Sequence, residues 1–183
     1  MVRNYTYLEI YLDDLNKKVS LSELEKHFKR PHQTVKNQLK ILVKEKILLE
    51  DKRTRFLFYE INRDNPALKE YLSICEKEKM FRIMNQRPLI KRLYTLLAHE
   101  VENMLVFGSA ATSEKFNDID LLVISKNNIK KIIEDFEITY SVKVHIIQAE
   151  KKDLTKTFIT EIRKKHMILK GHDFFVEMLY GRY

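Results

Sequence analysis

Cysteine is almost absent from this chain of 183 residues, in which Cys75 is the single example. One cysteine excludes an intramolecular disulfide and any zinc site built from several cysteines. Long apolar runs are also missing, because charged residues interrupt each candidate before it reaches the roughly 18 residues of a membrane span. Acidic residues at Glu9, Asp13 and Asp14 interrupt the N-terminal segment where a signal peptide needs an apolar stretch. We therefore expect a cytoplasmic protein that does not enter a membrane.

The sequence also lacks a Walker loop, a dinucleotide-binding glycine fingerprint, a histidine-rich metal motif and a nucleophile elbow. Hydrophobic residues make up 44% of the chain and charged residues 33%, which favours a folded core over disorder. The formal net charge is +8. Such a charge fits a polyanionic partner, and it equally fits a solvated surface rich in lysine and glutamate.

Three short segments near the N-terminus have the apolar spacing of amphipathic helices, over residues 5–15, 20–28 and 33–46. Ser20 and Glu23 form a capping box at the start of the second segment, and Pro31 separates it from the third. The side chains that we expect the last two helices to bury are Leu21, Leu24, Phe28, Val35, Leu39, Ile41 or Leu42, and Val43.

Two alternating apolar runs follow, over residues 47–50 and 56–61, and the polar segment 51–55 separates them. This pattern predicts a β-hairpin with a charged tip. The order helix, helix, turn, helix and hairpin resembles a winged helix-turn-helix domain over residues 5–62. The resemblance implies that the third helix and the hairpin bind DNA.

The third helical segment has a polar face that suits this role, since amide side chains can bind base edges and Thr or Lys can hold phosphates. The candidates for DNA binding on the helix and at the hairpin tip are His32, Gln33, Thr34, Lys36, Asn37, Lys40, Lys52, Arg53 and Arg55. A solvated helix face, or a winged helix that contacts only protein, are alternatives that the sequence leaves open.

Asn65 and Pro66 mark a stop, after which helical spacing runs from Ala67 to about Met84. A helix at this position can form the seam of a homodimer, which would match a palindromic DNA site, or it can pack on the next domain. We expect Cys75, on its apolar side, to be a small buried side chain rather than a reactive thiol.

The C-terminal half contains two buried strands whose ends carry polar residues. Residues 104–107 form a continuous apolar run that ends in Gly108-Ser109, and a second run over 118–124 opens with two acids. Because side chains alternate along a strand, Asp118 and Asp120 face one way while the residue between them faces the core.

These residues together predict a metal–phosphate site. Two carboxylates on one strand face repel one another unless a cation lies between them, and Mg²⁺ takes carboxylate and phosphate oxygens. Gly108 lets the backbone approach a phosphate closely, and Ser109 supplies a hydroxyl and an amide.

The stretch LVFGSAATSEKFNDIDLLVIS is similar to the signature of the nucleotidyltransferase superfamily related to DNA polymerase beta, in its minimal form. The resemblance extends from about Leu89 to the end of the chain. It implies that Gly108 and Ser109 contact the triphosphate of a nucleotide such as ATP, and that Asp118 and Asp120 bind magnesium.

One departure from the family pattern concerns the third carboxylate, which active members supply from a following strand. The matching strand covers residues 142–147, and His145 stands where that acid is expected. Histidine can accept a proton but is a poor ligand for Mg²⁺, and it can also be an ordinary histidine at a strand edge. Lys143 on the same face favours a phosphate or a lost site rather than a metal. We include His145 with Asp118 and Asp120 as catalytic candidates and leave open whether the site transfers a nucleotide or only binds it.

The expected fold is α+β, with a winged helix-turn-helix over residues 1–64, a connector helix over 65–86, and a nucleotidyltransferase-like α/β domain with a small mixed sheet over 87–183. The first functional hypothesis is a DNA-binding transcriptional regulator whose second domain binds a nucleoside triphosphate with Mg²⁺. The alternative is an active transferase that moves a nucleoside monophosphate to a hydroxyl of a protein, an RNA or a small molecule, with a toxin-type protein as a partner.

Overall fold

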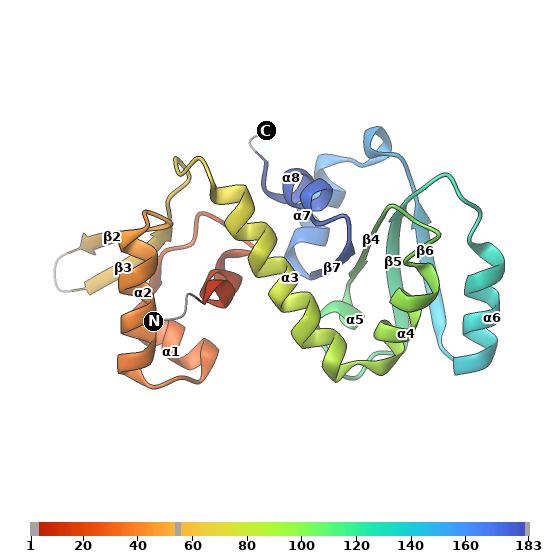
Figure 1. Ribbon diagram of the computed structural model, residues 1–183, viewed down its shortest axis with the longest axis horizontal. Coiled ribbons are helices and arrows are strands. Elements are labelled where there is room, and N and C mark those ends of the chain that lie inside the picture. The colour runs from red at the N-terminus through yellow and green to blue at the C-terminus, as the bar shows by residue number, and fades with distance from the viewer. Residues whose placement is uncertain (1–3, 54–55, 182–183) are drawn as a thin grey trace. The chain divides into compact units, whose positions relative to one another are not determined.

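The computed structural model describes residues 4–53 and 56–181, without the side chains of Arg53, Phe56 and Lys151. The fold is α+β and divides into two compact units, residues 1–75 and 76–183, with one small sheet in each (Figure 1). None of the helices in the described ranges combines the length and the apolar character that a bilayer crossing requires.

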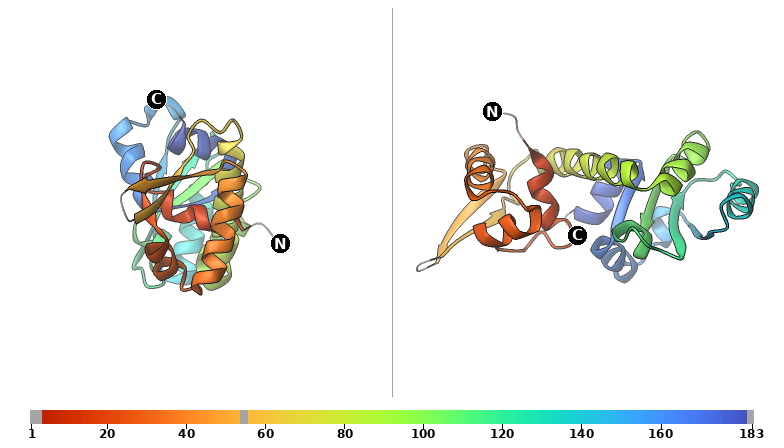
Figure 2. Two further views of the ribbon diagram at one scale, coloured as in Figure 1. Left: turned by 90° about the vertical axis from the view of Figure 1, so that its left-hand side faces the viewer. Right: turned by 90° about the horizontal axis from the view of Figure 1, so that it is seen from below.

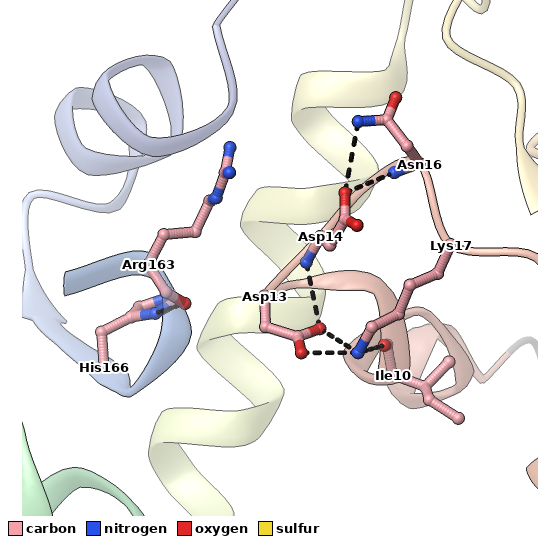
Figure 3. A network of polar contacts seen from close by, with 7 residues as sticks. All are labelled: Ile10, Asp13, Asp14, Asn16, Lys17, Arg163 and His166. Atoms are coloured by element: carbon pink, nitrogen blue, oxygen red, sulfur yellow. Dashed lines mark hydrogen bonds and ion pairs between the residues drawn. The ribbon is translucent and has the colours of Figure 1, made fainter. Parts of the chain in front are cut away.

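The first unit opens with η1 (Tyr5–Tyr11), a 3-10 helix, where the sequence predicted an α-helix over residues 5–15. The prediction was wrong about the type and the end of the helix, because polar contacts turn the chain after Tyr11. Lys17 Nζ donates to the Ile10 carbonyl at 3.3 Å and pairs with the Asp13 carboxylate (Figure 3). These contacts fold the segment back on itself before another helical turn can form.

Two α-helices follow, α1 (Leu21–Phe28) and α2 (His32–Lys44). The predicted capping box is confirmed, since Ser20 Oγ accepts the Glu23 N–H and the Glu23 carboxylate accepts the Ser20 N–H at 2.7 Å. The buried side chains on the two helices are Leu24, Val35, Leu39 and Leu42.

Part of the predicted core of these helices is only half-buried, namely Leu21, Phe28 and Val43; of the alternatives Ile41 and Leu42, the buried one is Leu42. Phe28 lies at the end of a two-turn helix, where its ring packs against Tyr7 with centroids 4.8 Å apart and keeps one side open.

The sheet of the first unit has the order β1-β3-β2, with β1 (Val19–Ser20), β2 (Leu48–Arg53) and β3 (Phe56–Ile61) all antiparallel. The predicted hairpin is confirmed, but β2 is longer than expected, because Asp51 and Lys52 pair with Phe58 and Leu57 instead of lying in a turn. The hairpin projects from the helices of this unit, as the right-hand view of Figure 2 shows.

Helix α3 (Leu68–Gln86) corresponds to the predicted connector and contains the boundary between the two units. Cys75 is fully buried on it, as expected. In the second unit, Met80, Ile83 and Met84 of this helix join the main hydrophobic core. That part of α3 therefore packs on its own domain, which was one of the two roles that the sequence left open.

The sheet of the second unit is mixed, with the order β6-β5-β4-β7. Its strands are β4 (Asn103–Phe107), β5 (Asp118–Ile124), β6 (Lys143–Gln148) and β7 (His166–Lys170). Strands β4 and β5 are antiparallel, β4 and β7 are antiparallel, and β5 and β6 are parallel. The helical elements are α4 (Pro88–Leu97), α5 (Ser109–Thr112), α6 (Lys130–Tyr140), η2 (Lys151–Asp153), α7 (Lys156–Lys164) and α8 (His172–Tyr180).

Helices cover the two faces of this sheet unequally. Side chains from α3, α4 and α6 pack with Val106, Ile119 and Leu121 in the larger core cluster. Helices α7 and α8 lie against the other face over β4 and β7, so that the outer half of that face, over β5 and β6, stays more open (Figures 1 and 2). The predicted carboxylate pair lies on this half-open face.

Candidate functional site

The two acids of β5 lie on the same face of the sheet, as strand alternation predicted. Ile119 between them is fully buried in the larger core, while the side chains of Asp118 and Asp120 are 40% and 29% exposed. In the sheet register Asp120 pairs with Phe107 of β4 on one side and with His145 of β6 on the other. Directly paired residues point to the same face, so these three side chains form one row across the sheet.

The structure brings His145 against both carboxylates. Its Nδ1 lies 3.3 Å from Asp120 Oδ1 and 3.8 Å from Asp118 Oδ2, and 63% of its side chain is exposed. A protonated imidazole would form ion pairs with the two acids, whereas a neutral one can accept a proton. Lys143 is directed elsewhere, because its Nζ lies 3.7 Å from Glu137 Oε2 on α6.

The turn after β4 brings the backbone against Asp120. Gly108 has φ +70° and ψ −145°, a region that is open essentially to glycine alone. A Cβ atom at this position would lie 2.5 Å from Asp120 Oδ2, so any side chain here would force the carboxylate to move. Ser109 follows at the start of α5 with an exposed side chain. Gly108, Ser109 and Asp120 are thus neighbours in space, as a metal–phosphate site requires.

Two contacts that sequence reasoning missed hold this turn in place. The Gly108 N–H donates to the Lys165 carbonyl at 3.1 Å, which joins the turn to the segment before β7. The buried Arg87 donates from Nη1 to the Ala110 carbonyl in α5. Burial lowers the pKa of the Arg87 guanidinium. The one signal in the sequence was an arginine before Pro88, and it does not reveal a partner 23 residues away.

A pocket of about 410 Å³ lies beside the same turn. It is lined by Phe107, Gly108, Phe158, Glu161, Ile162, Lys164 and Lys165. Sequence reasoning missed Phe158, because an isolated phenylalanine on a polar helix gives no sign of its neighbours. A larger pocket of about 1170 Å³ lies at the opposite ends of the strands, around Glu100, Ser125 and Gln148, and its lining does not include Asp118 or Asp120.

The row across the sheet ends in a buried polar cluster, since Phe107 also pairs with His166 of β7. His166 Nδ1 donates to the Arg163 carbonyl at 2.9 Å (Figure 3). Its Nε2 lies 2.7 Å from Glu76 Oε1. Tyr180 donates its hydroxyl proton to the same Glu76 oxygen at 2.5 Å. One ring nitrogen therefore faces a carbonyl, and the other faces both the Glu76 carboxylate and the Tyr180 hydroxyl, which lies 3.0 Å from Nε2.

Opposing effects act on the carboxyl group of Glu76. Complete burial favours its neutral form, but Lys79, His166 and the hydrogen bonds from His166 and Tyr180 outweigh burial and lower its pKa below the usual range. The glutamate is therefore ionised in the folded domain. None of these groups belonged to the predicted site, because Glu76 is 90 residues from His166 and 104 residues from Tyr180 in the sequence.

The structure places the predicted DNA-binding residues of the first unit mostly on one helix. His32, Gln33, Thr34, Lys36 and Lys40 are exposed on α2, and Asn37 is half-buried there. Gln33 donates to Asn37 at 2.8 Å, and His32 Nδ1 lies 2.6 Å from Glu25 Oε1. At the hairpin, Lys52 is exposed, whereas Arg55 and the side chain of Arg53 lie outside the described residues.

Comparison with known families identifies the second unit. Residues 83–170 match the model of the nucleotidyltransferase domain family. The chain contains a nucleotidyltransferase-like domain. The matched range of this domain includes Gly108, Ser109, Asp118, Asp120 and His145. No curated protein and no solved structure matches the chain.

Proposed function

We propose that the chain is a DNA-binding transcriptional regulator whose nucleotidyltransferase-like domain binds a nucleoside triphosphate together with Mg²⁺. The approach of Gly108 to Asp120 supports the nucleotide part most strongly, because a backbone without a side chain lies directly against one carboxylate of the pair. A phosphate bound to the turn and a cation bound to the carboxylates would then share oxygen ligands.

The residues at the site fit Mg²⁺ that arrives with the nucleotide. Mg²⁺ is commonly bound through one or two carboxylates plus substrate phosphates, and it keeps several waters. Within the described ranges, no group of three or more His, Cys, Asp or Glu side chains is arranged to hold a metal. Asp118 and Asp120 would therefore hold the ion only with help from phosphate oxygens, and Gly108 and Ser109 would orient those phosphates. The bound ion would supply neutralisation of the phosphate charge.

The first unit supports the DNA part of the proposal. Its order of elements, from η1 through α1 and α2 to the β2–β3 hairpin, resembles a winged helix-turn-helix domain. By this resemblance α2 is the recognition helix, and it exposes Gln33, Thr34 and Lys36 in its N-terminal half and Lys40 in its C-terminal half. The hairpin, with the exposed Lys52, takes the position of the wing.

His145 leads us to propose that transfer is slow or absent. In a nucleotidyl transfer, a hydroxyl oxygen attacks the α-phosphate, pyrophosphate leaves, and the hydroxyl proton must go to a base. The superfamily resemblance puts a third carboxylate at the position of His145. A protonated His145 neutralises Asp118 and Asp120 instead of adding negative charge for a cation.

The exposure of His145 favours a second candidate, an active transferase. With 63% of the side chain exposed, an acceptor hydroxyl can approach the imidazole, and a neutral imidazole can accept its proton. In this case the acceptor would be a hydroxyl on a protein, an RNA or a small molecule, and a toxin-type protein is the partner that we propose.

Transfer of label from the α-phosphate separates the two candidates. The protein is incubated with each of four α-labelled nucleoside triphosphates, with Mg²⁺ or Mn²⁺, in cell extract. Controls are the double variants Asp118→Asn/Asp120→Asn at the site and Glu134→Gln/Asp135→Asn on the exposed surface of α6. Label on a macromolecule with the wild type and the α6 variant, but not with the β5 variant, supports the transferase. No label, with nucleotide binding that the β5 variant loses, supports the regulator.

The variant His145→Asp refines that result by restoring an acid at the third position. A site slowed by the imidazole gains transfer in this variant. A domain that only binds nucleotides shows no label in either form.

A further inference from the structure

The pocket between Phe107 and α7 lies on the same sheet face as the carboxylate pair and next to it. Phe107 is the direct neighbour of Asp120 in the register, and Gly108 contributes both to the pocket and to the contact with Asp120. Neighbouring strands are about 4.8 Å apart, so the pocket begins one strand away from the carboxylates. Whatever binds at the Gly108 turn therefore extends into this pocket if it continues toward β7.

The walls of the pocket are aromatic and aliphatic, whereas its rim is charged. The rings of Phe107 and Phe158 pack edge to face, with centroids 5.9 Å apart and an interplanar angle of 86°. Ile162 is buried beside them, and Phe158 is half-buried. At the rim, Lys164 Nζ pairs with Glu161 Oε1 at 2.7 Å. A flat apolar group suits the walls, and a polar or anionic group suits the rim.

We infer that this pocket binds the base of the nucleoside triphosphate, with Phe158 as the residue that contacts it. The inference rests on the proposed function, since the triphosphate must lie at Gly108 and Asp120 for its base to reach α7. A pocket of about 410 Å³ is within the range that small ligands occupy. The half-buried ring of Phe158 can contact a base by stacking, which does not depend on a particular hydrogen-bond pattern.

The backbone also couples the pocket to the turn. Lys165 lines the pocket, and its carbonyl accepts the Gly108 N–H at 3.1 Å. Its side chain, one residue beyond the end of α7, is exposed and can reach phosphates bound at the turn. One ligand that combines a triphosphate and a base fits this arrangement of a glycine turn, a lysine and a phenylalanine pair.

Two other pockets of the domain do not share these features. The pocket of about 1170 Å³ lies at the far ends of the strands. The pocket of about 280 Å³ lies between α4 and α6, around Arg92 and Tyr140, on the opposite side of the sheet. Neither includes Gly108 or a neighbour of the carboxylate pair.

The test compares ligands with and without a base on the full chain. Titration calorimetry in the presence of Mg²⁺ measures binding of the four α,β-methylene nucleoside triphosphates and of tripolyphosphate, which lacks base and ribose. We expect Phe158→Ala to weaken nucleotide binding about tenfold, the range of base–aromatic stacking, and to leave tripolyphosphate binding unchanged. Phe158→Tyr, which keeps a ring, should restore nucleotide binding.

Phe174→Ala is the matched control, because Phe174 is also a half-buried member of an edge-to-face pair, with Phe175, but does not line the pocket. It should bind nucleotides as the wild type does. If Phe158→Ala binds nucleotides like the wild type, the base does not lie in this pocket, and the proposed nucleotide site itself still stands. If the wild type binds neither nucleotide nor tripolyphosphate, the proposed function and this inference both fail.

Discussion

The backbone of Gly108 lies directly against the carboxylate of Asp120. A Cβ atom added at position 108 would lie 2.5 Å from Asp120 Oδ2, which is too close for the two to keep their positions. The backbone at Gly108 has φ +70°, which disfavours any other residue. The turn and the carboxylate can therefore remain neighbours only while position 108 is glycine.

The variant Gly108→Ala tests this relationship. We expect it to lower the free energy of unfolding by about 1–3 kcal/mol, the cost of a strained backbone at one residue. It should also abolish Mg²⁺-dependent nucleotide binding, because Asp120 must move. Urea denaturation and calorimetric titration measure the two effects. Unchanged nucleotide binding would show that the close approach has no role in the site.

Because Glu76 lies in a buried charged cluster, we expect even the conservative change Glu76→Gln to cause a large loss of stability. Glu76→Gln removes the negative charge that His166 and Lys79 face. Breaking a buried ion pair on one side costs about 3–5 kcal/mol, because the remaining charge has no partner. Thermal unfolding should show this loss, whereas Glu134→Gln, which breaks an exposed pair with Lys130, should change stability by less than about 1 kcal/mol. Equal effects of the two variants would contradict the assignment of Glu76 as an ionised buried group.

The burial of His172 leads us to expect that the free energy of unfolding depends on pH. Burial lowers its pKa from 6.5 to about 4, Glu76 and Asp173 raise it and Lys77 lowers it. Its Nε2 has no hydrogen-bond partner in the described part of the chain. Below pH 6.5 the unfolded chain takes up a proton that the folded domain excludes until about pH 4, so the free energy of unfolding falls as the pH decreases through this window. The loss amounts to at most about 3 kcal/mol.

Denaturation between pH 7 and about 5.5 measures this effect apart from Glu76, because a glutamate of the unfolded chain, with its usual pKa of 4.5, is still almost fully ionised there. His172→Phe should flatten the profile in that window. The exposed His99→Gln should leave it as in the wild type. A profile that His172→Phe does not alter would assign the pH dependence to another group.

The proposed DNA-binding helix predicts a salt-dependent affinity. Lys36→Ala/Lys40→Ala should weaken DNA binding and reduce the slope of log K against log salt by about 1 for each phosphate contact removed. The matched control is Lys130→Ala/Lys131→Ala, which removes the same charge from exposed positions on α6. Fluorescence anisotropy at several salt concentrations measures both. If the two variants lose affinity equally, only the overall charge of +8 attracts DNA and α2 has no specific part.

The sequence predicted what depends on local patterns. Alternation along β5 placed Asp118 and Asp120 on one face and Ile119 in the core, and the structure agrees. The capping box at Ser20 is another local pattern that the structure contains. The type of η1 was not predictable in this way, because the Lys17 contacts that end it are specific to the folded chain.

Contacts between distant segments could not be predicted from the sequence. Phe107 and Phe158 become neighbours only when α7 packs beside β4, and neither residue belongs to a motif. Glu76 and His166 meet across 90 residues, and each looks like an ordinary surface residue in sequence. Their burial depends on the packing of whole elements, which no local pattern encodes.

The most direct test of the central claim is binding of each of the four α,β-methylene nucleoside triphosphates to the wild type and to Asp118→Asn/Asp120→Asn, each with and without Mg²⁺, by titration calorimetry. We predict that the wild type binds the nucleotide only with Mg²⁺, that the β5 double variant does not bind it, and that Glu134→Gln/Asp135→Asn binds it normally. Binding by the β5 variant as tight as that of the wild type, or no Mg²⁺-dependent binding of any of the four nucleotides by the wild type, would contradict the nucleotide site proposed here.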